Sequence, residues 1–184
     1  MVTARVLRPG VFAAVFSLAL WATAGQALEL TSPDVANGAA LKVAQVNLRC
    51  GGENRSPALA WSGAPKGTGS FAVTMFDSDA NGGRGFWHWL VFNIPANVQR
   101  LPAGAGSESA LPKGAVQAEN DFGMPGYGGA CPPPGSGSHH YTLTVYALVA
   151  PQLHLGNNVS ASAVVTWLKG HALATATLTG TYSR

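Results

Sequence analysis

The sequence predicts a mainly β fold built as a single domain, with antiparallel strands and one helix near the C-terminus. Short apolar runs alternate with turns rich in glycine and proline, which is typical of such folds. The sequence has neither internal repeats nor long linkers that would separate independent domains. Only 10% of the residues are charged and 47% are hydrophobic, a composition that favours a packed core over disorder.

The first residues, 1–27, have the pattern of a secretory signal peptide. Arg5 and Arg8 supply positive charge, an apolar run of about 12 residues follows, and small residues precede a cleavage site after Ala27. Cleavage after Ala24 is the alternative. The apolar run is shorter than the roughly 20 residues that cross a bilayer, and no later stretch is long enough. No cysteine follows the small residues, so a lipid anchor is not expected.

The remaining domain, 28–184, is nearly neutral, because loss of the signal peptide leaves nine Lys and Arg residues against eight Asp and Glu residues. A nucleic-acid binder would need a basic face for phosphate contacts, so this class is not expected. We therefore predict a soluble protein without a transmembrane segment, located in the periplasm or secreted.

The clearest strands are residues 70–76, 87–94 and 141–148. In 141–148, apolar side chains fall on both faces, which places this strand inside a sheet. In 175–182, threonines alternate with Ala, Leu, Gly and Tyr, which predicts a half-exposed final strand.

One helix is predicted, over residues 160–171, just before the final strand. Val164 and Leu168 belong to an apolar series with spacings of three and four residues, and a glycine lies near its end. Either Asn158 or Ser160 can cap its start.

Residues 103–114 and 123–138 are predicted loops. The second is rich in glycine, but its four prolines make it too constrained for a flexible linker, and long shaped loops often carry function. In an exported chain, Cys50 and Cys131 are expected to form a disulfide. The closed loop of about 80 residues would stabilise the fold by roughly 4 kcal/mol. Two separate buried thiols are the alternative, and no cluster has the spacing of a zinc site.

Asp77 and Asp79 enter a turn at the end of the first clear strand. Their carboxylates suit either an Asx turn, which is a structural role, or a ligand site. His88 lies between two tryptophans in an apolar strand, so it is buried or lines a pocket. A lone histidine in such a strand is more often a core residue than a ligand.

The second predicted loop and the strand after it combine several groups suited to an anion. Gly128 and Gly129 allow backbone N–H groups to turn toward a small anion. Prolines and a disulfide at Cys131 would hold that backbone in place. If the strand has begun by His139, then His139 and His140 point to opposite faces. The glycine-rich run matches neither a P-loop nor a dinucleotide-binding fingerprint.

Together these segments resemble the phosphatidylethanolamine-binding protein family, also called Raf kinase inhibitor-like proteins, and specifically its exported bacterial branch. The matching motifs cover nearly the whole of 28–184 in the family's order. They are Asn54-Arg55-Ser56-Pro57, Leu59-Ala60-Trp61, Asp77-Ser78-Asp79, Trp87-His88-Trp89, Asn93-Ile94-Pro95, Asn120-Asp121-Phe122-Gly123, Gly126-Tyr127-Gly128-Gly129, Cys131-Pro132-Pro133-Pro134-Gly135, His139-His140-Tyr141 and Val145-Tyr146-Ala147-Leu148.

The resemblance implies two antiparallel sheets with Greek-key connections and one small anion pocket at the edge of the larger sheet. It implies no cofactor and no metal. The ligand-binding residues expected from the motifs are Asp77, Asp79, His88, Gly128, Gly129, Cys131, His139 and Tyr141.

Two histidines, a phenol and backbone N–H groups suit weak, reversible binding of a phosphate ester. Asp77 would fix a histidine tautomer and favour its protonated form, or bind the ammonium of an ethanolamine head group. The family's usual prolines after Asp77 are replaced by Ser78 and Asn81. Asn81 and the following glycine suit a different tight turn, and we expect a looser pocket rim there.

The leading hypothesis is non-enzymatic binding of a small anionic ligand that resembles phosphate or phosphoethanolamine. Family members are also described as inhibitors of other proteins. A protein target is therefore the second possible partner, besides the small anionic ligand. One alternative is a hydrolase that uses Asp77, His88 and His139 as base, metal ligand or acid, but neither a GxSxG nor an HExxH motif is present. Another is a secreted interaction protein with a vestigial pocket. His154 and His171, like His140, are expected to be structural or surface residues.

Overall fold

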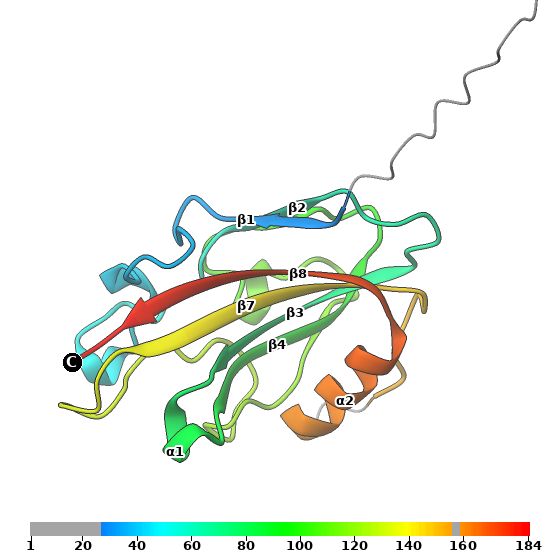
Figure 1. The fold of residues 1–184 in the computed structure, drawn as a ribbon. Coiled ribbons are helices and arrows are strands. Elements are labelled where there is room, and N and C mark those ends of the chain that lie inside the picture. The colour runs from blue at the N-terminus through cyan, green and yellow to red at the C-terminus, as the bar shows by residue number, and fades with distance from the viewer. Residues whose placement is uncertain (1–26, 156–158) are drawn as a thin grey trace, which may run out of the picture.

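The computed structural model describes residues 27–155 and 159–184, which form two antiparallel β-sheets and a helix that covers one of them (Figure 1). All of the predicted signal peptide except Ala27 lies outside the described residues. The smaller sheet consists, in spatial order, of β1 (Glu29–Thr31), β2 (Leu59–Ser62) and β5 (Arg100–Leu101). The larger sheet consists, in spatial order, of β6 (Val116–Gln117), β4 (Phe86–Pro95), β3 (Ser70–Asp77), β7 (His139–Leu148) and β8 (Ala172–Tyr182). The helices are α1 (Ala80–Gly83) and α2 (Ala161–His171), with short 3-10 turns at Val43–Gln45, Leu48–Cys50 and Glu108–Ala110.

The larger sheet has a Greek-key order. Read from β7, its strands lie in the order β7, β3, β4 and β6, so the last of these strands along the chain returns to lie beside the first. Between β4 and β6 the chain visits the smaller sheet as β5. The predicted mainly β fold with two antiparallel sheets is confirmed.

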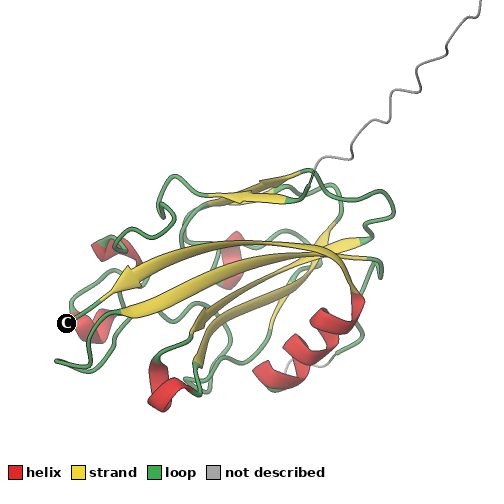
Figure 2. Ribbon diagram, in the orientation of Figure 1, coloured by secondary structure: helices red, strands yellow, loops and turns green. Residues whose placement is uncertain are grey.

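Two apolar layers hold these elements together. The first lies between the sheets, where the rings of Trp61 in β2 and Phe71 in β3 are 5.3 Å apart. The second lies between the other face of the larger sheet and α2, which crosses that face (Figure 2). Its buried members include Tyr146 of β7 and Val164 and Leu168 of α2. Both faces of the larger sheet are therefore buried near its centre, which explains why its strands read as continuous apolar runs.

The predicted strands are present, and three of them begin earlier than the sequence indicated, β4 by one residue and β7 and β8 by more. β7 starts at His139 and lies between β3 and β8, inside the sheet as predicted. β8 starts at Ala172, and its more exposed positions, which include Thr175 and Thr177, alternate with partly or fully buried small or apolar residues. Backbone pairing with β7 along nearly the whole of β8 extends the strand beyond the alternating threonines.

The predicted helix is also confirmed. The Oγ atom of Ser160 accepts a hydrogen bond from the N–H of Ala163 at 3.4 Å and so caps α2. The alternative cap, Asn158, lies outside the described residues. Within the described ranges, no helix is long and apolar enough to span a membrane.

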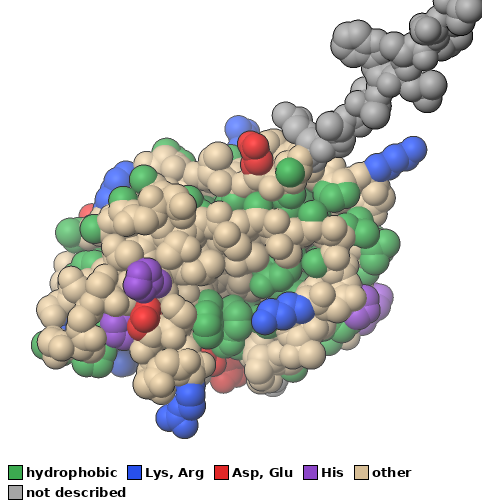
Figure 3. All heavy atoms as spheres, viewed as in Figure 1, with side chains coloured by type: hydrophobic (Ala, Val, Ile, Leu, Met, Phe, Trp, Pro, Cys, Tyr) green, Lys and Arg blue, Asp and Glu red, His purple; other side chains and the backbone are tan. Residues whose placement is uncertain are grey.

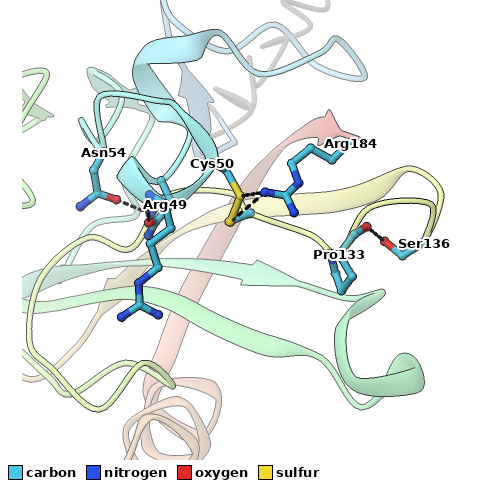
Figure 4. Close-up of a disulfide and its surroundings, with 9 residues drawn as sticks. Arg49, Cys50, Asn54, Pro133, Ser136 and Arg184 are labelled. Atoms are coloured by element: carbon cyan, nitrogen blue, oxygen red, sulfur yellow. Dashed lines mark hydrogen bonds between the residues drawn. A yellow bond between two sulfur atoms is a disulfide. The ribbon is translucent and has the colours of Figure 1, made fainter.

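The predicted disulfide is present between Cys50 and Cys131, whose Cα atoms are 5.6 Å apart (Figure 4). It joins the 3-10 turn Leu48–Cys50 to the glycine- and proline-rich loop that precedes β7. Figure 4 shows the guanidinium group of Arg184 against the sulfur atoms. The disulfide thus anchors the loop that precedes β7.

Candidate functional site

A cavity of about 710 Å³ lies at the end of the larger sheet, where β3 ends and β4 and β7 begin. Figure 3 shows histidine and acidic side chains side by side at this end of the molecule. The walls of the cavity come from the turn after β3, the start of β4, the loop before β7, and β7 itself. The lining includes six of the predicted residues, which are Asp77, Asp79, His88, Cys131, His139 and Tyr141.

The Asp77 carboxylate is the centre of this cluster. Its Oδ2 atom lies 2.8 Å from Nδ1 of His139 and 4.0 Å from Nε2 of His88. Its Oδ1 atom accepts hydrogen bonds from the N–H groups of Asp79 and Ala80 at 2.9 and 3.2 Å. The sequence left an Asx turn and a site role as alternatives for this residue. The structure combines the turn and the cavity position in one carboxylate, because its two oxygen atoms face different partners.

His88 is buried and has one fixed nitrogen. Its Nδ1–H donates to the carbonyl oxygen of Gly128 at 2.7 Å, which directs Nε2 toward Asp77. Rings of Phe86, Phe122 and Tyr141 surround it. Burial lowers the pKa of His88, while the Gly128 carbonyl and the Asp77 charge oppose that shift. Without a bound ligand, the imidazole of His88 therefore favours the neutral form.

His139 and His140 point to opposite faces of β7, as the sequence predicted. His139 is buried, whereas His140 is exposed. Besides its bond to Asp77, His139 places Nε2 3.0 Å from Oγ of Ser136, and that hydroxyl donates to the carbonyl oxygen of Pro133 at 2.7 Å. Ser136 was not predicted as a site residue, since nothing in the sequence distinguishes it from Ser138 in the same loop.

The hydroxyl of Tyr141 is buried and makes no hydrogen bond with the described residues. Burial raises the pKa of this phenol, and the negative charge of Asp77 raises it further. The hydroxyl therefore keeps its proton. A buried polar group without a partner costs about 1–3 kcal/mol, so its presence beside a cavity is informative.

Asp79 lies at the mouth of the cavity rather than at its centre. Its Oδ2 atom accepts hydrogen bonds from the N–H and Nδ1 of His140 at 2.7 and 2.9 Å. The hydrogen bond from the His140 side chain is the main cause that lowers the pKa of Asp79. His140 is thus a partner of a cavity residue, although it does not line the cavity itself.

The expectation that Gly128 and Gly129 direct their N–H groups toward an anion is wrong. The N–H of Gly128 donates to the carbonyl of His88 at 2.9 Å, and the N–H of Gly129 donates to Oδ1 of Asn54 at 2.7 Å. Neither glycine is a lining residue. A Cβ atom on Gly129 would lie 2.5–2.6 Å from the backbone around Val46, and one on Gly128 would lie 2.3 Å from the Phe122 ring. These glycines allow close packing behind the cavity instead.

The chain makes a tight turn at Asn81, in the left-handed conformation. Asn81 and Gly82 have φ values of 54° and 68°, and the peptide bonds of the described residues are all trans. The Asn81 side chain donates to the carbonyl of Gly85 at 3.0 Å and closes the turn. The lost family prolines are therefore replaced by a different, hydrogen-bonded turn at this part of the rim.

Apolar side chains also line the cavity and were not predicted. They are Phe86, Phe122, Pro132 and Pro133. Phe122, Pro132 and Pro133 lie inside the family motifs and Phe86 directly precedes one, so position relative to the motifs was the available signal. Their presence makes part of the cavity wall apolar, with the rings of Phe86 and Phe122 beside His88.

Comparison with known proteins now decides the family. The family model described as phosphatidylethanolamine-binding protein matches residues 31–183. The chain belongs to the phosphatidylethanolamine-binding protein family. Escherichia coli YbcL is 46% identical over 160 residues, which cover 85% of this chain and 87% of YbcL. E. coli YbhB is 44% identical over 133 residues, which cover 72% of this chain and 84% of YbhB.

Solved structures of the phosphatidylethanolamine-binding protein family agree with the fold. The crystal structure of E. coli YbcL matches with a TM-score of 0.82 and 45% identity, and the match covers 85% of this chain and 98% of that one. The homologue CT736 of Chlamydia trachomatis matches with a TM-score of 0.73 and 30% identity, over 86% of this chain and 99% of that one.

Proposed function

We propose that this protein binds a small oxyanion, such as a phosphate ester or a phospholipid head group, in the cavity around Asp77. The observation that carries the proposal is that Tyr141 is a cavity-lining residue whose buried hydroxyl lacks a hydrogen-bond partner among the described residues. A ligand oxygen would supply the missing partner. No lysine or arginine is found among the cavity-lining residues of the described chain, which suits weak and reversible binding.

The size and apolar wall of the cavity favour a ligand with an organic part. A volume of about 710 Å³ lies within the range of small-molecule sites and exceeds the size of a free phosphate ion. The rings of Phe86 and Phe122 would contact that organic part, while Tyr141 and His88 meet the oxyanion. The family name, phosphatidylethanolamine-binding protein, agrees with such a ligand.

The proposal is of a binding protein rather than an enzyme. The cavity serine Ser136 lies with Oγ 3.0 Å from Nε2 of His139, but its hydroxyl hydrogen is donated to the carbonyl oxygen of Pro133 at 2.7 Å, so the imidazole is not placed to accept its proton as a base would. The signal-peptide pattern, the disulfide and a mycobacterial relative named as lipoprotein LppC support export to the periplasm or the cell exterior. The biological role that we propose for ligand binding is regulation of a protein partner.

Histidine side-chain NMR tests the proposal. Titration with phosphate and with phosphoethanolamine should shift the resonances of His88 and His139 in a saturable way and leave His154 unchanged. Tyr141→Phe should weaken binding without changing the fold. If His88 and His139 stay silent at all ligand concentrations, the cavity is vestigial and the proposal is wrong.

A further inference from the structure

The cavity holds two buried imidazoles but a single buried carboxylate. Oδ2 of Asp77 is 2.8 Å from Nδ1 of His139 and 4.0 Å from Nε2 of His88. One carboxylate can neutralise one imidazolium only. A second positive charge would remain uncompensated in a buried site, where desolvation opposes it. The two histidines are therefore expected to differ in protonation.

Hydrogen-bond donors show which histidine carries the charge. The Ser136 hydroxyl has one hydrogen, which it donates to the carbonyl of Pro133, so its oxygen accepts from Nε2 of His139. Nδ1 of His139 donates to the carboxylate of Asp77. An imidazole that donates from both nitrogens is an imidazolium. His139 and Asp77 thus form a buried ion pair with no net charge.

His88 has the opposite arrangement. Its Nδ1–H donates a hydrogen bond to the carbonyl oxygen of Gly128. Its Nε2 atom lies at the cavity, 4.0 Å from Oδ2 of Asp77 and therefore beyond hydrogen-bond distance. In the neutral form, Nε2 presents a lone pair that repels the oxygen of an anion. The charged or titratable groups around it are Asp77 from β3, His139 and Tyr141 from β7, and Asp121 from the loop after β6.

We propose that the site binds singly charged oxyanions and takes up one proton at Nε2 of His88 for each ion bound. This inference rests on the proposed function. The new imidazolium donates to the bound oxygen, and the anion provides the counter-charge that the cavity lacks. A doubly charged ion would leave one negative charge uncompensated next to Asp77 and, at the mouth, Asp79. Monoanions such as phosphodiesters are therefore preferred over dianions.

Calorimetry of the purified protein measures this coupling directly. Dimethyl phosphate is the probe, because it stays singly charged across neutral pH, and sulfate is the doubly charged comparison. Titrations in two buffers with different ionisation enthalpies give the number of protons taken up. We expect uptake to approach one proton per dimethyl phosphate above the pKa of His88, and the Kd to rise about tenfold per pH unit there. Sulfate should bind more weakly than dimethyl phosphate at every pH.

Variants assign the proton to His88. His88→Gln should abolish proton uptake and make the remaining affinity independent of pH. His154→Gln, which changes an exposed histidine outside the cavity lining, is the matched control and should behave as the unmodified protein. Proton uptake is measured on the unmodified protein, so the proposal can still be tested if the His88→Gln variant folds poorly.

The outcomes separate the two proposals. Binding of dimethyl phosphate without proton uptake would overturn the coupling and leave the proposed function intact. Tighter binding of sulfate than of dimethyl phosphate would overturn the preference for monoanions. Absence of binding for both ions and for phosphoethanolamine would overturn the proposed function and the coupling together.

Discussion

Nδ1 of His139 lies 2.8 Å from Oδ2 of Asp77, and the two residues are 4% and 2% exposed. They are 62 residues apart in sequence and meet because β3 and β7 are neighbours, with Asp77 paired to Tyr141 in the ladder. The contact thus joins two neighbouring strands beside the cavity.

Loss of the Asp77 charge is expected to destabilise the fold. Asp77→Asn keeps the size of the side chain but leaves the His139 imidazolium buried without its partner, which costs about 3–5 kcal/mol. Chemical denaturation measures the loss. Lys42→Gln, which breaks an exposed ion pair with Asp34, should cost less than about 1 kcal/mol. Equal effects of the two variants would contradict the buried ion pair.

Removal of the Tyr141 hydroxyl should change stability and binding in opposite directions. Tyr141→Phe deletes a buried group that has no partner, so the free energy of unfolding should stay unchanged or rise, while affinity for phosphoethanolamine falls. Tyr127→Phe is the control. Its buried hydroxyl donates to the carbonyl of Gln45 at 2.9 Å, and its loss should cost about 1 kcal/mol. A Tyr141→Phe variant with unchanged affinity would mean that the ligand does not reach the phenol.

The pH dependence of stability should reflect His88. Its pKa is lowered from 6.5 in the folded protein, so between that value and the lowered one the unfolded chain binds a proton that the folded protein does not. The free energy of unfolding should therefore fall as the pH falls through 6.5. Denaturation at several pH values should show that the free energy of unfolding depends less on pH in His88→Gln. An unchanged pH dependence in that variant would mean that other titrating groups cause the effect.

The disulfide should contribute strongly to stability. Replacement of Cys50 and Cys131 by serine opens a link across 81 residues, which the chain-entropy model values at roughly 4 kcal/mol. Denaturation of the double variant measures the loss. The variant should also bind anions more weakly, because the loop that carries Ser136 is no longer anchored. Unchanged affinity would show that the cavity wall is held by its other contacts.

Two glycine substitutions should have opposite effects on stability. Gly129→Ala places a methyl group 2.5–2.6 Å from the backbone of residues 45–47, so the loop must shift and the melting temperature should fall. Gly170→Ala lies inside α2 with no atom within 4 Å, and should stabilise the protein by about 0.5–1 kcal/mol. Thermal denaturation measures both, and a tolerated Gly129→Ala would contradict the packing role.

Local sequence patterns predicted those features that depend on neighbouring residues. The alternation in β8, the Ser160 cap of α2, the opposite faces of His139 and His140, and the tight turn at Asn81 all follow from backbone geometry over a few positions. The family motifs added the grouping of Asp77, His88 and His139, which spacing along the chain does not contain.

The roles of the glycines and of Ser136 could not be predicted in the same way. The partner of the Gly129 amide is Asn54, 75 residues earlier, and a glycine-rich loop suits close packing as well as anion contacts. Ser136 is one of two serines in its loop, and its contact with His139 depends on how the disulfide and prolines direct that loop.

The sequence by itself determined the mainly β architecture, the helix before the last strand, the pairing of the two cysteines and the identity of six residues that line the cavity. Only the tertiary structure decided which hydrogen-bonding groups remain free in the cavity. The physical reason is that each N–H, hydroxyl or imidazole nitrogen takes one main partner, and here those partners come from segments far apart along the chain.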